Sequence, residues 1–230
     1  MSADPTPRAP LAVLGGTGAE GSGLAFRWAR AGHPVAIGSR DAARAQAVAA
    51  ELNALVGRDA VRGAALAEAA ASAAIVVLAV PYAAQRATAL ALRAELAGKI
   101  LVDVTVPLVP PKVGTVQLPA GGSAVAALQA ELGDGVKVVS AFQNVGAHHL
   151  KDPDHRIECD VLVCGDDPAA RDAVIALAAA AGLRGLHAGP IANSAAAEAL
   201  TSLLISINRR YKVPSAGLRI TGLPDGAREA

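Results

Sequence analysis

The 230-residue sequence has few aromatic side chains and almost no net charge. Phe, Trp and Tyr together make up 2% of the residues, and the formal net charge at pH 7 is +1. Nucleic-acid binding usually needs a basic surface, and single-strand binding also needs aromatic rings on which bases stack. The composition therefore predicts no nucleic-acid partner.

Long apolar runs are also lacking, although 53% of the residues are hydrophobic. Much of that share is alanine, and a strongly apolar run such as residues 73–80 is far shorter than the roughly 18 residues of a membrane-spanning helix. The N-terminus has Pro5, Pro7 and Pro10 but no apolar signal segment, so residues 1–10 are predicted to be a disordered tail. We therefore expect a cytoplasmic protein without membrane contact.

Cysteine is scarce, with Cys159 and Cys164 the two examples. They bound an apolar segment that predicts a strand over residues 159–164. Because their separation of five positions is odd, the two thiols should point to opposite faces and should not form a disulfide.

No metal site is predicted. The cysteines lack further ligands at finger-like spacing. His148, His149 and His155 lie in a polar segment and are interpreted as solvated residues or residues at the rim of a pocket.

A glycine-rich segment near the N-terminus is the most informative feature that is present. The apolar run Leu11–Leu14 precedes Gly16, Gly18 and Gly21, which have the spacing G-x-G-x-x-G. In dinucleotide-binding folds such glycines permit a sharp turn, a close approach to the pyrophosphate and close packing of helix on sheet. The alternative is a purely structural glycine turn.

The context of the motif favours dinucleotide binding over that alternative. A strand precedes it, a helix is predicted to run from it to Arg30 and stop at Gly32, and a second apolar strand follows at residues 35–37. The first backbone N–H groups of the helix are unpaired and would bind a diphosphate.

The end of the second strand indicates which dinucleotide is bound. NAD sites usually have Asp or Glu there, whereas this chain has Ser39 and Arg40, with Arg44 one helical turn further on. A hydroxyl and two guanidinium groups suit a 2'-phosphate. Asp41 is assigned as the N-cap of a helix over residues 42–55. The sequence thus predicts NADP, the alternative being that both arginines belong to a solvated helix start.

Strands and helices alternate along the rest of the chain, as in a doubly wound sheet. Further strands are predicted at residues 61–63, 75–80, 100–103 and 136–140, and helices at 83–97 and 124–132, the latter capped by Ser123. Ligands bind at the carboxyl ends of such strands. We therefore place the nicotinamide among three segments that follow strands, namely residues 80–82, 103–107 and 140–147.

The last third of the chain is predicted to add a strand, a helix capped by Asp167, another strand near residues 183–188 and a long helix, Ser194–Tyr211. The predicted fold class is α/β, a Rossmann-type, mostly parallel sheet (residues 11–158) with a small C-terminal α/β extension (159–230). The long helix has one apolar face, which consists of Leu200, Leu203, Leu204 and Ile207. This face is expected either to pack on the chain's own sheet or to join two subunits in a homodimer.

Several further segments together resemble the NADPH-dependent F420 reductases over nearly the whole chain. They are Gly-Gly-Thr-Gly at 15–18, Gly-Ser-Arg at 38–40, Val-Cys-Gly-Asp-Asp at 163–167, Ala-Gly-Pro-Ile-Ala-Asn-Ser at 188–194 and Glu-Ala-Leu-Thr at 198–201. The resemblance implies a dimeric enzyme that passes a hydride between NADP(H) and the deazaflavin coenzyme F420.

The resemblance also implies positions for both molecules. The diphosphate would be held by Thr17, Gly18, Ala19 and Glu20. The 2'-phosphate would contact Ser39, Arg40 and Arg44, and Val80 and Ala147 would flank the nicotinamide. The deazaflavin would lie near Gln143, Val145 and the pair Gly217 and Leu218.

One departure concerns the acceptor side. Archaeal members of that family often have a His in the segment after the sixth strand, where this chain has Phe142-Gln143-Asn144. The segment also begins Ser-Ala-Phe, like that of the related domain of the six-transmembrane metalloreductases, which reduce flavin. A flavin or other acceptor therefore remains an alternative, as does a redox sensor that binds NADP(H) without turnover.

Acid–base groups typical of carbonyl reduction are missing. Short-chain dehydrogenases need a Tyr with a Lys four residues later, but Tyr82 is followed by Arg86 and Tyr211 by Ser215. The long helix from Ser194 carries no lysine of the kind that hydroxyacid dehydrogenases use. No catalytic acid or base is predicted, which suits a deazaflavin, because positioning two rings can supply most of the catalysis.

Overall fold

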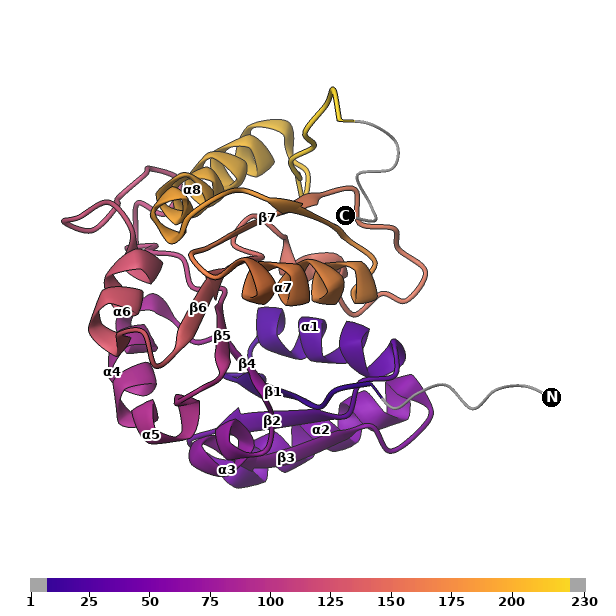
Figure 1. Cartoon of the computed structure of the whole chain (residues 1–230). Helices are drawn as coiled ribbons and strands as arrows, with labels where there is room; N and C mark the ends of the chain where they lie inside the picture. The colour runs from indigo at the N-terminus through magenta and orange to yellow at the C-terminus, as the bar shows by residue number, and fades with distance from the viewer. Residues whose placement is uncertain (1–7, 224–230) are drawn as a thin grey trace.

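The protein is represented by a computed structural model that describes residues 8–223 (Figure 1). Most of the predicted disordered tail, residues 1–7, lies outside the described residues. Residues 8–10 are exposed and belong to no helix or strand.

A single eight-stranded sheet forms the centre of the molecule, with the strand order β3-β2-β1-β4-β5-β6-β7-β8. All neighbouring strands are parallel except β6 and β7, which are antiparallel. The strands are β1 (Leu11–Leu14), β2 (Val35–Ser39), β3 (Val61–Ala65), β4 (Ile75–Leu78), β5 (Ile100–Asp103), β6 (Lys137–Ser140), β7 (Asp160–Gly165) and β8 (Arg184–His187). The predicted doubly wound, mostly parallel fold is confirmed.

Helices cover both faces of this sheet, and two short 3-10 turns complete the described elements. They are α1 (Ala19–Arg30), α2 (Ala42–Val56), α3 (Leu66–Ala71), α4 (Tyr82–Ala91), α5 (Arg93–Leu96), α6 (Ala124–Leu132), η1 (Ala147–His149), α7 (Pro168–Ala180), η2 (Ile191–Asn193) and α8 (Ser194–Tyr211). Within the described residues, no helix combines the length and apolar character needed to cross a bilayer.

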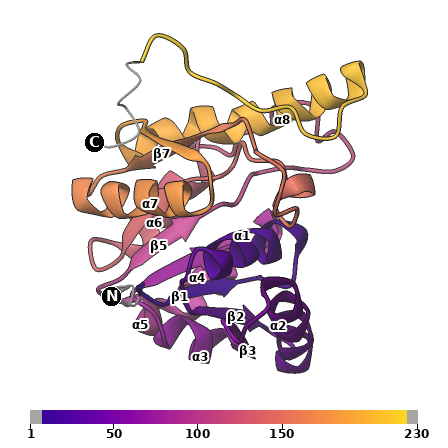
Figure 2. The ribbon, with the colours of Figure 1, turned by 90° about the vertical axis from the view of Figure 1, so that its right-hand side faces the viewer.

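Alternation of side chains along the strands produces two separate cores, one on each face of the sheet. On β1, Leu11 and Val13 pack with α1, α2 and α7, whereas Ala12 and Leu14 pack with α3, α4, α5 and α6. Helix α8 lies beside β7 and also contacts α6 (Figures 1 and 2). The chain thus buries both faces of its sheet, as a parallel sheet requires.

Trp28 joins distant parts of the first core. Its side chain is fully buried, and its Nε1 donates a 2.8 Å hydrogen bond to the Leu177 carbonyl of α7. Its ring also contacts Phe142 edge to face, with ring centroids 5.8 Å apart. Truncating such a side chain costs about 3 to 5 kcal/mol, so this residue fixes α1 against both α7 and the loop after β6.

Three helix starts follow the predicted capping residues. Asp41, Ser123 and Asp167 accept backbone hydrogen bonds in the first turns of α2, α6 and α7, respectively. Helix α1 ends at Arg30 and is followed by Gly32 at φ +100°. These local predictions are confirmed because each depends on a short contact that the sequence itself supplies.

Other boundaries differ from the prediction. Helix α3 was not predicted, because the residue before it is Ala65, which offers no capping side chain. The helix predicted at residues 83–97 is two helices that break at Leu92. Strand β4 ends at Leu78, not at residue 80, although the Ala79 N–H still donates to the Leu14 carbonyl oxygen of β1 at 2.8 Å and both Ala79 and Val80 lie close to Gly15.

The two cysteines are free and buried, as predicted. Cys159 packs in the same core as Val161 and Val163, so Cys164 lies on the other face of the strand. Strand β7 continues the sheet next to β6. The division of the chain at residue 158 therefore falls within one continuous sheet, and it remains a prediction.

Candidate dinucleotide and acceptor site

The glycine loop after β1 has the form expected of a dinucleotide cradle, with one change in the role of its glycines. The left-handed residue is Gly15, at φ +80°, and not Gly16. Gly16 instead packs on Ile37, where an added Cβ would lie 2.8 Å from the Ile37 side chain. Gly21 packs equally closely, since its Cβ would come 2.9 Å from the Gly15 carbonyl oxygen.

Gly18 differs from these packed glycines. An added Cβ there would meet only one backbone oxygen, 3.5 Å away, so this side of the loop is open. Gly18 is the N-cap of α1 and supplies no side-chain cap. The first N–H groups of the helix therefore have no side-chain partner at their end and can bind an anion.

A cavity of about 470 Å³ extends from this loop along the carboxyl ends of β1, β2 and β4. Its lining includes Gly15, Thr17, Gly18, Ser39, Arg40, Asp41, Arg44, Leu66, Ala79, Val80, Pro81, Ala84 and Thr88. The cavity thus unites Thr17 and Gly18, the three residues predicted for a 2'-phosphate, and Val80.

The charges around this cavity suit a phosphate at the end of β2. Arg40 and Arg44 are exposed, and the backbone N–H of Arg44 donates to Asp41 Oδ1 at 3.1 Å. Asp41 is therefore the N-cap of α2, as predicted, although its side chain also borders the cavity. A hydroxyl and two guanidinium groups can bind a 2'-phosphate there by charge-assisted hydrogen bonds.

Glu20 stands out among the residues of the loop. Its Oε1 atom is enclosed and has no hydrogen-bond partner. Burial raises the pKa of this carboxyl from 4.5 to about 8. At neutral pH the group is therefore mostly neutral. Glu20 is in the first turn of α1 and is not among the residues that line the cavity.

The second part of the site lies at the ends of β5 and β6. Asp103 is fully buried and accepts hydrogen bonds from Gln85 Nε2 at 2.5 Å and from the Thr105 N–H at 2.8 Å. Burial raises its pKa to about 6, while these hydrogen bonds act in the opposite direction and the charge of Glu198 adds to the rise. A buried carboxyl thus connects α4, through Gln85, to the backbone that follows β5.

Gln143 lies directly above Asp103. Its side-chain Nε2 donates to the backbone carbonyl oxygen of Asp103 at 2.7 Å. The backbone carbonyl oxygen of Gln143 accepts from Thr201 Oγ1 of α8, also at 2.7 Å. The preceding residue, Phe142, is fully buried at φ +72°, a conformation that costs a bulky residue about 1 to 3 kcal/mol. Strained backbone of this kind is concentrated at functional sites.

Unpaired polar atoms cluster in the same region. Within the described residues, five buried side-chain oxygens lack a partner, and all lie in segments at the carboxyl ends of β1, β5 and β6. They belong to Glu20, Thr105, Ser140, Gln143 and Asn144. Buried polar atoms in folded proteins are nearly always paired, so this end of the sheet has the donors and acceptors to bind a polar ligand or water.

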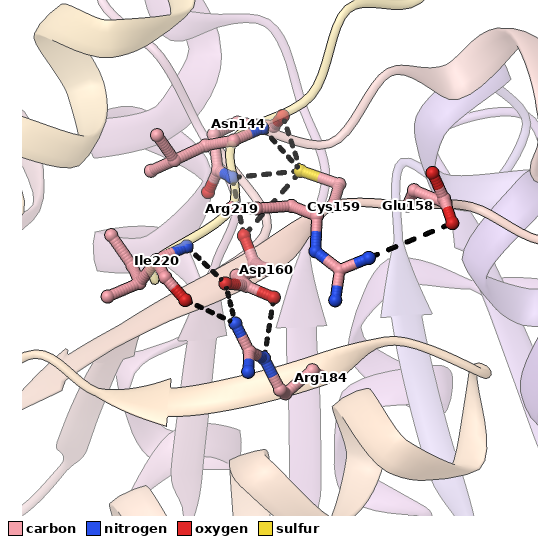
Figure 3. A network of polar contacts seen from close by, with 8 residues as sticks. Asn144, Glu158, Cys159, Asp160, Arg184, Arg219 and Ile220 are labelled. Carbon is pink, nitrogen blue, oxygen red and sulfur yellow. Dashed lines mark hydrogen bonds and ion pairs between the residues drawn. The ribbon is translucent and has the colours of Figure 1, made fainter. Parts of the chain in front are cut away.

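The C-terminal segment closes against the start of β7 (Figure 3). The Leu218 carbonyl oxygen accepts from the Asp160 N–H at 2.7 Å, and the Leu218 N–H donates to Cys159 Sγ at 3.4 Å. Asp160 in turn pairs with Arg184 and accepts from the Ile220 N–H at 2.6 Å. This pairing lowers the pKa of Asp160 against the effect of its burial.

Asn144 connects this segment to the loop that carries Gln143. Its Nδ2 donates to the Asp160 carbonyl oxygen at 2.6 Å (Figure 3). Gly146 packs on Ser215, with no room there for a Cβ. Residues 215–218 therefore lie against residues 144–146 and Cys159, while their contact with Gln143 is indirect.

The predicted acceptor residues are mostly enclosed. Gln143 and Val145 are buried. Ala147, which was predicted to flank the nicotinamide, opens η1 and packs on the first core. Sequence reasoning placed Pro81 and Asp103 in segments near the nicotinamide, but it missed Leu66, Ala84 and Thr88 in the dinucleotide cavity and the pairing of Gln85 with Asp103. Only the strand register, which pairs Asp103 with Ser140 and Leu78, brings that pair to the site.

Comparison with known proteins agrees with this geometry. A family model described as "NADP oxidoreductase coenzyme F420-dependent" matches residues 10–107. The F420-dependent NADP reductase of Methanothermobacter thermautotrophicus is 40% identical, with 94% of this chain and 96% of the relative covered. Its counterpart from Methanothermobacter marburgensis is 39% identical, with 94% of this chain and 99% of the relative covered.

A solved structure from Arthrobacter sp. FB24, described as a candidate F420-dependent NADP-reductase, has a similar fold. It superposes with a TM-score of 0.76 at 30% identity, covering 93% of this chain and all of the other. The similarity to the curated reductases extends over nearly the whole length of both chains. This chain therefore belongs to the F420-dependent NADP reductase family.

Proposed function

We propose that this protein transfers a hydride between NADP(H) and coenzyme F420. The observation that supports this most directly is the cavity that joins the glycine loop to Ser39, Arg40 and Arg44, because it offers a diphosphate cradle and a phosphate site to one dinucleotide. Family membership supplies the acceptor, since the relatives are F420-dependent NADP reductases.

In this proposal, different residues bind different parts of the two cofactors. The backbone from Thr17 to Gly21 binds the diphosphate, with Glu20 protonated beside it. Val80 and Ala147 flank the nicotinamide. Gln143 and Val145, together with the adjacent 215–218 segment, border the acceptor ring.

The chemistry needs positioning more than proton transfer. The two cofactors, held by the residues above, would supply the hydride donor and the hydride acceptor themselves, so that no proton transfer from the protein would be needed. The chain therefore has to align two flat rings about 3 to 3.5 Å apart and exclude water. No residue is assigned a catalytic acid or base role, and the strained, buried Phe142 keeps the acceptor loop in one conformation.

A phosphate-bearing acceptor tail would meet basic residues near the end of α8. Arg209, Arg210, Lys212 and Arg219 are candidates for that contact. Arg219 lies 3.7 Å from Glu158 in a partly exposed ion pair, which is weak enough to exchange for a phosphate (Figure 3).

Absorbance measurements with F420, NADPH and the purified protein test the proposal. The visible absorbance of F420 should disappear, and deuterium from stereospecifically labelled NADPH should appear at C5 of the product. Turnover of FMN but not F420 at matched concentrations would instead identify a flavin reductase. If the protein binds NADPH but turns over neither F420 nor FMN, a redox sensor without turnover would be the remaining function.

We also propose that the protein is a homodimer joined through α8. On this helix, Leu203 is 48% exposed and Ile207 is 40% exposed, while Leu204 is buried against the chain's own core. Val116, Leu118 and Val213, on neighbouring segments, are also large exposed apolar residues. Such a face favours a two-fold interface.

Light scattering on variants tests the dimer. Leu203→Glu should give monomers, because it places a charge in the apolar face. Leu55→Glu is the matched control, since Leu55 is 54% exposed on α2, outside this face. A wild-type protein that is monomeric at micromolar concentration would contradict the proposal.

The cytoplasm is the compartment we propose. Both thiols are free and buried, which fits a reducing environment, and the proposed substrates are soluble redox cofactors.

A further inference from the structure

The end of η1 and the loop that follows it place three side chains of metal-binding types together. His149, Asp152 and His155 each direct a ligand atom into one small volume, in which all three atoms lie within 4.8 Å of one another. The sequence suggested solvated histidines here, and this arrangement becomes visible only in the folded loop. The cluster lies outside the cavity assigned to the dinucleotide.

The histidine rings are close enough to constrain each other. Those of His149 and His155 are stacked, with centroids 3.8 Å apart and an interplanar angle of 13°. His148 meets His149 edge to face, with centroids 4.7 Å apart.

The backbone of this loop is held from beneath by Arg27 of α1. The Nε of Arg27 donates to the Leu150 carbonyl oxygen at 2.7 Å. Its second terminal nitrogen donates to the carbonyl oxygens of His149, Asp152 and His155, at 2.9, 2.7 and 3.1 Å. One guanidinium group thus binds the backbone of all three candidate ligands and holds the loop in its conformation before any ion binds.

Other contacts of this loop do not occupy the atoms that would bind a metal. Asp152 Oδ1 accepts from the N–H groups of Asp154 and His155, which leaves Oδ2 free to coordinate. Lys151 pairs with Glu51 of α2 at 3.2 Å. Leu150 is fully buried and anchors the loop against Gly23.

We propose that His149, Asp152 and His155 form a binding site for a divalent transition-metal ion. Zn²⁺ is the ion with which we would test it. Two imidazoles and one carboxylate are a ligand set that zinc uses, with further positions filled by water. Tetrahedral zinc needs donor atoms about 3.4 Å apart, given bond lengths of about 2.0 to 2.1 Å. The three ligand atoms, now within 4.8 Å of one another, can reach that separation by side-chain rotation, because Asp152 and His155 are exposed and His149 is half-buried. The bound ion would tie the two ends of the loop together.

Calorimetric titration of the metal-free protein with Zn²⁺ tests this site, without reference to enzymatic activity. The wild type should bind one ion per chain at micromolar concentration. His155→Ala and Asp152→Asn should each weaken binding at least tenfold. His187→Ala is the matched control, because His187 forms a surface pair with Asp172, 3.0 Å away, outside this cluster.

Co²⁺ absorbance and thermal unfolding provide independent measurements. Co²⁺ should give visible bands with the wild type and the control but not with His155→Ala. Zinc at a hundredfold excess over its Kd should raise the Tm by roughly 5 to 10 °C in the same two proteins. Melting each variant without metal separates a folding defect from lost coordination. Equal zinc affinity in the wild type, His155→Ala and Asp152→Asn, or no micromolar binding by the wild type, would overturn the proposal.

Discussion

The dinucleotide end and the acceptor end of this site are built in different ways. At the dinucleotide end, residues from one continuous stretch, Leu11 to Arg44, supply the glycine loop, the helix N-terminus and the phosphate-binding arginines. At the acceptor end, the contacts join residues far apart in sequence, such as Gln143 with Asp103 and Thr201, or Asn144 with Asp160.

This difference determines how each end responds to substitution. The arginines at the dinucleotide end are exposed, so changing them should alter ligand binding and leave the fold intact. The polar groups at the acceptor end are buried and share partners, so changing them should affect stability as well.

The largest effect is expected for Asp103. Its pKa is about 6 in the folded protein against an ordinary value of 3.8, so the folded state binds its proton more tightly. The protonated Asp103 carboxyl therefore contributes to the free energy of unfolding. This contribution is fully present below about pH 4 and is lost as the pH rises through 6. The loss amounts to about 3 kcal/mol. Asp103→Asn should remove this decline, since an amide oxygen can still accept from the Thr105 N–H.

Urea unfolding of both proteins at several values between pH 4 and pH 7 measures this effect. The wild type should lose stability relative to Asp103→Asn across that range, while the two proteins should have similar NADPH affinities. Parallel stability curves would show that Asp103 titrates normally, and lost NADPH affinity would show that the two ends are not independent.

Arg40→Glu should have the next largest effect, and only on ligand binding. It replaces an attraction for the 2'-phosphate by a repulsion, and we expect NADPH binding to weaken by roughly 1.5 to 3 kcal/mol, about ten- to a hundredfold. NADH lacks that phosphate, so its affinity should change little. Fluorescence titration with both cofactors measures the two affinities.

Arg30→Glu is the matched control for charge. Arg30 is exposed at the opposite end of α1 from the glycine loop, so the same charge change there should leave NADPH binding almost unaltered. Equal losses of NADPH and NADH affinity in Arg40→Glu would show that Arg40 does not contact the 2'-phosphate.

The same contrast explains what the sequence could predict. Asp41, Ser123 and Asp167 cap their helices through contacts three residues away, and the glycine loop follows from its own spacing. By comparison, the pairing of Gln85 with Asp103 depends on the position of α4 against β5, and Thr88 reaches the cavity only through that helix. Gly217 and Leu218 contact Cys159 because the chain returns across β7, which no local pattern encodes.

The smallest predicted effect concerns Glu20, whose enclosed carboxyl oxygen belongs to the first turn of α1, directly after the glycine loop. Because its pKa is about 8, raising the pH from 7 to 9 places a negative charge beside the diphosphate. NADPH affinity should then fall on the order of tenfold in the wild type and stay level in Glu20→Gln. Titrations at pH 6.5, 7.5, 8.5 and 9.5 measure both, since the 2'-phosphate, with a second pKa of about 6, is already mostly ionised throughout that range. A parallel fall in both proteins would mean that another group is responsible, and the dinucleotide end would then depend on exposed charges and backbone alone.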